Sequence, residues 1–216
     1  MRRQISAVIA LLVILLLLLS GCLTPEKSWT NETPELQMYT EEFPPYNFRG
    51  PEGNVSGSST EVVREIAARL GEEVTIDLVP WSIGYNRTLS IPGTALFSTA
   101  RTLERENIFR WVGPIGSYEM TFYARNNSSI SLASLEDAKK AGKIAVVRDD
   151  ARHQYLLARN VTNLVPCPDD EACVRALMSG ESQLWLGSDS VAASETIVRA
   201  GYQANDVRPL YTVQKS

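Results

Sequence analysis

Two arginines lie four residues apart in the stretch "RTLERENIFRWVGPI", residues 101–115. A guanidinium group donates two parallel hydrogen bonds to one carboxylate, so Arg101 and Arg105 indicate a cradle for an anionic ligand. The alternative is a solvated helix face on which the arginines pair with Glu104 or Glu106. The first interpretation places the guanidinium groups inside a cleft, and the second places them in water.

A second charged cluster, "RDDAR" at residues 148–152, stands on a loop that leads into a predicted helix. Backbone N–H groups there, together with Asp150 and Arg152, are candidates to complete an anion site, and solvated charge is the alternative. His153 is the only histidine, and neither a glutamate pair nor a Ser/His/Asp set offers an acid and a base. We therefore predict no catalytic residues, cofactor or metal.

The three cysteines divide into Cys22 near the N-terminus and a pair, Cys167 and Cys173, in the segment "CPDDEAC". For the pair we favour a local disulfide bond, because an even number of cysteines fits an exported chain. A zinc site is the alternative, but the chain lacks the further cysteines or histidines that zinc needs.

The N-terminus carries the pattern of an export signal. Arg2 and Arg3 precede an apolar run at residues 5–19, which leads to Leu-Ser-Gly and then Cys22. The small residues before Cys22 resemble the lipobox of exported lipoproteins. We predict that residues 1–22 are a signal peptide and that Cys22 is lipidated; a short uncleaved anchor is the alternative. Residues 23–34 are polar and predict a flexible tether, which would hold an extracytoplasmic domain at the outer face of the cytoplasmic membrane.

Asparagine usage agrees with export, because six of the ten asparagines begin an Asn-x-Ser/Thr triplet. Such triplets mark candidate glycosylation sites on exported chains, and ordinary loop composition is the alternative. The six are Asn31, Asn54, Asn86, Asn126, Asn127 and Asn160. A net charge of −4 and no basic stripe argue against nucleic-acid binding.

Short apolar runs alternate with amphipathic helical stretches, which is typical of βαβ units and predicts an α/β fold. Predicted strands occupy residues 36–40, 74–80, 94–99, 120–125, 143–147, 163–167 and 183–187. Predicted helices occupy residues 60–70, 131–142, 151–158, 170–179 and 191–200. The pattern restarts after Gly116, so we predict two lobes, residues 35–119 and 120–205, with a ligand cleft between them.

The first predicted helix has an apolar face and a glycine stop, Gly71. Helical spacing predicts that five of its apolar residues share the face that packs on the sheet. These residues are Val62, Val63, Ile66, Ala67 and Leu70.

The order of these segments resembles the extracytoplasmic solute-binding proteins, family 3, that serve amino-acid ABC transporters. The resemblance extends over residues 36–201. The similar segments are "FPPYNF", "EVVREIAARLG", "LVPW", "TARTLERENIFRWVGPI" and "SLEDAKKAGKIAVVRDDARHQYL". It implies a type II periplasmic-binding-protein-like fold, in which each lobe is a small sheet flanked by helices.

The resemblance also implies ligand-binding roles for five residues. The family grips the ligand carboxylate at the position of Arg105 and offers a hydroxyl at the position of Ser98. It stacks aromatic rings over the ligand at the positions of Phe43, Tyr46 and Trp81.

Other positions depart from the family pattern. Gln183 and Ser188 stand where members that bind polar amino acids carry aspartates, the second of which holds the ligand's ammonium. Asp189 is the only nearby acid left to meet a ligand amine. Members also return to their first lobe through a strand and helices. We therefore expect residues 206–216 to begin that crossover and the first lobe to be incomplete.

The resemblance implies a substrate-binding lipoprotein of an ABC importer. It would capture a small polar or carboxylate-bearing, amino-acid-like solute between its lobes and deliver it to a membrane permease. We expect a monomer whose partners are the solute, the permease and, through the lipid, the membrane. The same fold serves two alternatives, a ligand-sensing extracellular domain of a signalling receptor and a dehydratase or lytic enzyme.

Overall fold

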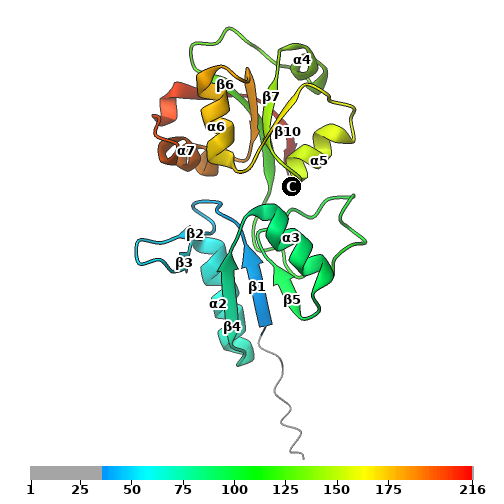
Figure 1. The fold of residues 1–216 in the computed structure, drawn as a ribbon, viewed down its shortest axis with the longest axis vertical. Helices are drawn as coiled ribbons and strands as arrows, with labels where there is room; N and C mark the ends of the chain where they lie inside the picture. Colours follow the sequence, from blue (N-terminus) through cyan, green and yellow to red (C-terminus); the bar gives the residue numbers. More distant parts are fainter. Residues whose placement is uncertain (1–35, 216) are drawn as a thin grey trace, which may run out of the picture. The chain divides into compact units, whose positions relative to one another are not determined.

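The computed structural model describes residues 36–215. The predicted signal peptide, the lipidation site Cys22, the tether and Asn31 lie outside these described residues. The described chain contains two α/β lobes, which we call lobe one (residues 36–118) and lobe two (residues 119–215) (Figure 1). The predicted fold class is confirmed.

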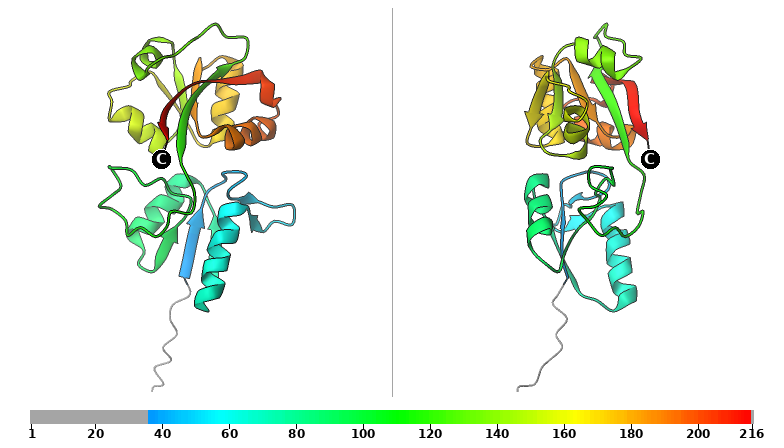
Figure 2. Two further views of the ribbon diagram at one scale, coloured as in Figure 1. Left: turned by 180° about the vertical axis from the view of Figure 1, so that it is seen from behind. Right: turned by 90° about the vertical axis from the view of Figure 1, so that its right-hand side faces the viewer.

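Lobe one is built on three parallel strands in the order β4-β1-β5. They are β1 (Leu36–Thr40), β4 (Val74–Leu78) and β5 (Thr94–Leu96). Helices α2 (Ser58–Leu70) and α3 (Trp81–Ser90) lie on opposite faces of this sheet (Figure 2). A short hairpin, β2 (Phe48–Arg49) and β3 (Val55–Ser56), precedes α2. Because the three strands are parallel, their carboxyl ends meet at one edge, where the loops that follow them converge.

Helix α2 confirms the glycine stop and corrects the predicted packing face. Gly71 ends the helix in the left-handed conformation at φ 69°, which glycine adopts without steric cost. Val63 and Ala67 are buried, whereas Ile66 and Leu70 are 41% and 71% exposed, and Val62 is exposed as well. Only the narrow stripe through Val63 and Ala67 meets the sheet, and helical spacing alone could not identify it within a wider apolar arc.

Lobe two is built on five strands in the order β10-β6-β9-β7-β8. They are β6 (Glu119–Arg125), β7 (Ile144–Val147), β8 (Leu164–Cys167), β9 (Leu184–Gly187) and β10 (Val207–Lys215). The strands β8, β7 and β9 are parallel, whereas β6 runs antiparallel to β9 and β10 runs antiparallel to β6.

Four helices cover the two faces of the second sheet. They are α4 (Leu135–Lys140), α5 (Ala151–Leu157), α6 (Asp170–Ser179) and α7 (Ser190–Arg199). Helices α4 and α5 lie on one face, and α6 and α7 lie on the other (Figures 1 and 2). Strand β7 shows why, because Ile144 and Val146 pack toward α4 and α5 while Ala145 and Val147 pack toward α6 and α7. A strand that is apolar at every position is thus buried on both faces.

Five elements of the fold were not predicted from the sequence, namely the strands β2 and β3 of the hairpin, α3, a short 3-10 helix at Ala204–Asp206 and β10. Strand β10 pairs with β6 along its length, so residues 207–215 belong to the second sheet, and the predicted end of lobe two at residue 205 is too early. Pro209 obscures this strand in the sequence, because proline is tolerated in strands at sheet edges and irregularities. The register of β10 does shift between Pro209 and Tyr211.

Candidate ligand-binding pocket

A small pocket lies where the carboxyl ends of the parallel strands of lobe one face the start of α5 in lobe two. Its lining comes from the loops after β1 and β5, the start of α3, the segment before β6 and the start of α5. The lining residues are Glu41, Phe43, Trp81, Ser98, Ala100, Arg105, Tyr118, Asp150, Ala151 and Arg152. The free volume among them is about 30 Å³, close to the share of one water molecule in the liquid. Larger ligands therefore require the pocket to open.

Arg105 brings an incompletely bonded guanidinium into this pocket. The residue is 1% exposed, and its backbone forms turns rather than the helix of the alternative interpretation. Its Nε donates to Gln154 Oε1 at 3.1 Å and its Nη1 to the Ala100 carbonyl at 3.4 Å, whereas its Nη2 is buried without a partner. The guanidinium lies over the ring of Trp81, 4.8 Å from its centroid. Burial lowers the pKa of Arg105 from its usual high value, but a guanidinium remains charged at neutral pH.

Ser98 supplies a second unused donor at the same pocket. It follows β5 and adopts a left-handed backbone conformation at φ 56°, which is uncommon for a residue other than glycine. Its hydroxyl oxygen is buried and has no hydrogen-bond partner. A strained backbone and an unsatisfied polar atom at one position are typical of functional sites.

The charged groups from lobe two are, in contrast, already bonded to each other. The Arg152 Nε donates to Asp150 Oδ2 at 2.5 Å, and Nη1 and Nη2 donate to the two oxygens of Asp170 at 2.8 Å each. Asp150 also accepts the backbone N–H of His153 and so caps α5. Although burial opposes it, the two carboxylates raise the pKa of Arg152 above its ordinary value. Arg152 lines the pocket, contacts neighbouring carboxylates and holds Asp150 in place, and its predicted anion-binding role stays a prediction.

Glu41 is a pocket residue that the sequence analysis missed. It directly follows β1, at the carboxyl end of the central parallel strand, and that position is the signal that could have identified it. Burial raises the pKa of Glu41 to about 8; the charges of Asp170 and Asp150 raise it further, and those of Arg152 and Arg105 lower it. The carboxyl group therefore keeps its proton to a higher pH than an ordinary glutamate does, and a cation bound beside it would favour the ionised form.

Three predicted site residues have other partners. Arg101 is exposed and forms an ion pair with Glu106, with Nε 2.8 Å from Oε2. Tyr46 donates its hydroxyl hydrogen bond to Asp189 Oδ2 at 3.1 Å, and Asp189 Oδ1 accepts the N–H groups of Val191 and Ala192 at the start of α7. The pocket lining includes none of these three residues. The opening pair of arginines thus separates into one pocket residue, Arg105, and one surface residue.

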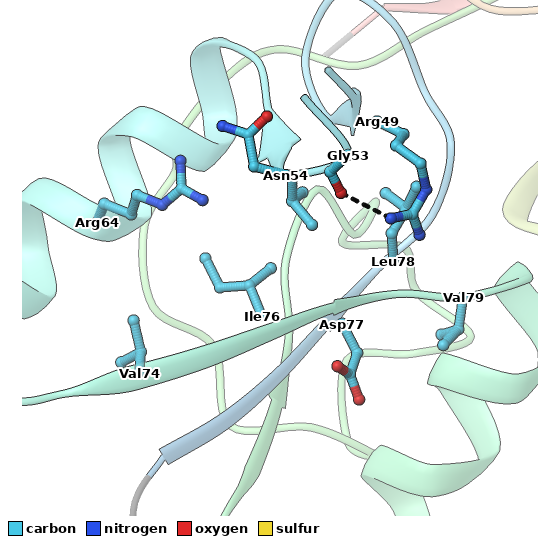
Figure 3. A pocket seen from close by; sticks show the side chains of 10 residues that line it. Arg49, Gly53, Asn54, Arg64, Val74, Ile76, Asp77, Leu78 and Val79 are labelled. Carbon is cyan, nitrogen blue, oxygen red and sulfur yellow. Dashed lines mark hydrogen bonds between the residues drawn. The ribbon is translucent and has the colours of Figure 1, made fainter. Parts of the chain in front are cut away.

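A larger hollow of about 480 Å³ lies along β4 in lobe one (Figure 3). Val74 and Ile76 on β4 contribute its apolar wall, and Arg49 and Arg64 stand near it. Arg49 donates to the Gly53 carbonyl at 2.8 Å, and Arg64 pairs with Glu61 on the surface of α2. Its arginines are engaged, and none of its lining residues holds a buried side-chain polar atom without a partner, so the smaller pocket around Arg105 is the better candidate site despite its size.

The cysteine pair lies in a buried cluster of lobe two. Cys167 ends β8, and Cys173 lies on α6; both are buried and unbonded. A hydrogen bond between the two thiols lowers the pKa of Cys167, and burial raises that of Cys173. The disulfide between them stays a prediction. Within residues 36–215, no cluster of His, Cys, Asp and Glu side chains could hold a metal ion.

The family of the chain follows from its sequence as well as from this geometry. Residues 36–208 match the bacterial extracellular solute-binding proteins, family 3, so the chain belongs to this family, whose members are mostly non-catalytic binding proteins. A search of curated protein sequences found no significant match. Within residues 36–215, no helix is both long and apolar enough to cross a membrane.

Solved structures with this fold share little sequence with the chain. A histidine kinase sensor domain similar to periplasmic binding proteins has a TM-score of 0.77 at 23% identity, over 84% of this chain and 79% of that one. The arginine-bound form of a truncated ArgBP from T. maritima has a TM-score of 0.71 at 17% identity, over 83% and 84%. The substrate-binding protein of an amino-acid ABC transporter has a TM-score of 0.66 at 19% identity, over 82% and 77%. At these identities the likeness establishes the fold alone.

Proposed function

We propose that this solute-binding protein captures a small amino-acid-like solute, whose carboxylate is held by Arg105 and Ser98. The observation that carries the proposal is the buried Arg105 Nη2 without a partner, next to the unbonded Ser98 hydroxyl. An unsatisfied buried donor costs about 1–3 kcal/mol, and more when it is charged. A ligand carboxylate would accept hydrogen bonds from both groups and remove that cost.

Glu41 defines the complementary end of the proposed ligand. A half-buried carboxyl group with a raised pKa ionises readily when a cation binds beside it. We therefore infer that the ligand carries an amine or another cationic group in addition to its carboxylate. Phe43 and Trp81, which line the same pocket, would cover the apolar part of such a molecule.

Access to the pocket requires the two lobes to separate. Hydrogen bonds now cross it from lobe one to lobe two, from Trp81 Nε1 to the Asp149 carbonyl at 3.0 Å and from Arg105 Nε to Gln154. We infer a hinge motion that breaks these bonds, admits the solute and closes again around it. The closed form would then deliver the solute to an ABC permease, with Cys22 as the lipid anchor of an extracytoplasmic monomer.

A sensory role is the second candidate function. It is supported by the similarity to the histidine kinase sensor domain, which has the highest TM-score of the structures named above. Both roles need the same ligand pocket, so a readout downstream of binding distinguishes them. Loss of solute uptake in cells that lack the protein would indicate transport, whereas intact uptake with a lost transcriptional response would indicate sensing.

We also infer that the exported chain is N-glycosylated on lobe one and lobe two. All five candidate asparagines within the described residues are exposed, namely Asn54, Asn86, Asn126, Asn127 and Asn160. None of them lines the candidate pocket, so glycans there would leave ligand binding free. The intact mass of the protein from its native host tests this, because an unmodified mass rules out glycosylation.

The binding proposal is tested with a ligand found by a thermal-shift screen of amino acids and small carboxylates. An Arg105→Lys variant should then bind that ligand about thirty-fold or more weakly, because an ammonium group cannot reproduce the planar fork of a guanidinium. Titration calorimetry measures the change.

The control for this variant is Glu104→Gln, at the residue directly before Arg105 in the same turn. Glu104 is exposed, and an exposed charge of this kind contributes only about 0–1 kcal/mol. Its affinity should stay close to that of the wild type. An unchanged affinity in Arg105→Lys would remove the support for the carboxylate cradle.

A further inference from the structure

The cysteine pair encloses the residues that support the lobe-two side of the pocket. Cys167 and Cys173 flank Asp169 and Asp170 in the chain, and the Cys167 thiol donates to the Val165 carbonyl at 3.4 Å. Both side chains lie in the buried cluster that contains Trp185. The two cysteines thus lie at the ends of a short segment, and both ends pack against the same core.

Asp169 and Asp170 have separate structural tasks in this segment. Asp169 accepts the Ala172 N–H at 2.7 Å and caps α6. Asp170 accepts hydrogen bonds from both terminal nitrogens of Arg152 and, at 3.3 Å, from the indole N–H of Trp185. The position of Asp170 is thus set by the start of α6, and the position of Arg152 is set in turn by Asp170.

Arg152 connects Asp170 to a residue of the pocket lining. Its Nε contacts Asp150, which lines the pocket and caps α5 through the His153 N–H at 2.8 Å. The Arg152 and Asp150 side chains are only 5% and 6% exposed, so few other groups can replace these contacts. A continuous series of bonded side chains thus runs from the cysteine segment to the pocket wall.

We propose that Cys167 and Cys173 form a disulfide bond that fixes Asp170 under Arg152, and that this modification sets the affinity of the pocket. With the ring closed, the start of α6 cannot move away from the end of β8, and Asp150 stays in its binding position. With the thiols reduced, the start of α6 opens more often and Asp150 loses its support. The effect on affinity rests on the proposed function, whereas the effect on the α5 cap does not.

The bond forms by thiol–disulfide exchange with a disulfide-bearing oxidant. The Cys167 thiol loses its proton and attacks the oxidant's disulfide, which releases one thiol and leaves a mixed disulfide. Cys173 then loses its proton and attacks the Cys167 sulfur, which releases the second thiol. The two cysteines lose two electrons and the oxidant's disulfide gains them. Since both sulfurs are buried in the folded chain, the exchange precedes the packing of α6.

Amide hydrogen exchange of the full-length exported protein tests the proposal without any ligand. We expect the His153 amide to exchange about tenfold more slowly in the oxidised form than after reduction, because its acceptor Asp150 is then held in place. The Asp137 amide, which donates to Ser134 at the start of α4, is the internal control and should change little.

Two variants distinguish an effect that acts through Asp170 from a general stabilisation of lobe two by the disulfide bond. A Cys167→Ala/Cys173→Ala variant should behave like the reduced protein in the presence and absence of oxidant. An Asp170→Asn variant, which keeps the cysteines but weakens the contact with Arg152, should show the same His153 exchange rate in both redox states. Alkylation of the unfolded, unreduced protein shows in parallel whether the bond exists.

Two results would overturn the proposal: two free thiols per chain in the exported protein, or equal His153 exchange in the oxidised and reduced wild type. The ligand arm uses L-arginine as the probe, and we expect about tenfold tighter binding by the oxidised form. If L-arginine binds neither form while the His153 exchange rate responds to oxidation, the assigned ligand class is wrong, but the disulfide bond still stabilises the start of α5. If L-arginine binds both forms with equal affinity, the proposed effect of the disulfide bond on the affinity of the pocket is wrong.

Discussion

Lobe one and lobe two bury their apolar side chains to different depths. In lobe two Phe122, Val146 and Leu186 are fully buried, whereas Tyr39 and Trp81, the most buried large apolar side chains of lobe one, remain 5% exposed. Of twelve large apolar side chains that are exposed within the described residues, nine lie at residues 62–112. Five strands with helices on both faces enclose a core, while three strands with two helices leave much of theirs uncovered.

The helices of the two lobes also begin differently. In lobe two each of the four helices starts with a side chain that accepts a backbone N–H, namely Ser134, Asp150, Asp169 and Asp189. In lobe one α2 and α3 start at Gly57 and Pro80, without a side-chain cap. Caps contribute about 1 kcal/mol each, so local interactions reinforce lobe two more than lobe one.

The two lobes also differ in the polar groups that they contribute to the pocket. Lobe one contributes Arg105 and Ser98, both with unused donors, whereas in lobe two Arg152 is fully bonded to carboxylates. The difference suggests a division of labour, in which lobe one supplies the groups that bind the solute and lobe two supplies a rigid surface that closes on it.

The largest expected effect is a difference in core energetics between the lobes. Leu186→Ala removes a fully buried side chain from β9 and should lower the free energy of unfolding by roughly 2–5 kcal/mol. Leu103→Ala is the matched substitution in lobe one, where the side chain is 92% exposed, and should change it by less than about 0.5 kcal/mol. Denaturant unfolding measures both, and similar losses would contradict the contrast in burial.

Hydrogen exchange of backbone amides compares the local stability of the two lobes directly. Val146 and Met38 both lie on strands with a neighbour on each side, β7 between β9 and β8 and β1 between β4 and β5. We expect the Val146 amide to exchange roughly 100-fold or more slowly than the Met38 amide, because lobe one opens at a lower free energy. Equal protection of the two amides would mean that the lobes unfold as one unit.

A smaller effect is expected from the pH dependence of binding to lobe one. The pKa of Glu41 is raised to about 8, so the free protein carries a proton there at lower pH. A cationic ligand requires the carboxylate and displaces that proton. Its affinity should therefore rise with pH, by up to about tenfold per pH unit, and level off above pH 8.

Calorimetry between pH 6 and pH 9 checks this prediction. A Glu41→Gln variant cannot release the proton, so its affinity should be lower and nearly independent of pH. A wild-type affinity that does not change below pH 8 would remove Glu41 from the ligand contacts.

The elements with strong periodicity were predictable from the sequence, and those defined by their neighbours were not. The apolar run of β7 and the capped helix α6 were both predicted close to their observed bounds. Strand β10 was missed because its edge position tolerates Pro209, and the packing face of α2 was misjudged because Val62 and Ile66 fit the same helical arc as Val63.

The pocket residues divide in a similar way. Residues at strand ends and in the "RTLER" turn, such as Ser98 and Arg105, were predicted from the family resemblance and do line the pocket. The pairing of Arg152 with Asp170 was not predictable, because it joins α5 to α6 across eighteen residues of chain. Glu41 was missed although it directly follows the predicted strand at residues 36–40, the end of a parallel strand where ligands bind in such folds.

The most direct test of the central claim compares a ligand with its own carboxamide. Titration calorimetry at pH 7 would measure the solute returned by the screen and the analogue in which an amide replaces the carboxylate. We predict that the wild type binds the amide about thirty-fold or more weakly, because the Arg105 Nη2 and Ser98 donors lose their anionic acceptor, and that Arg105→Lys reduces this difference. Equal affinities of the wild type for the acid and the amide would contradict a carboxylate held by Arg105.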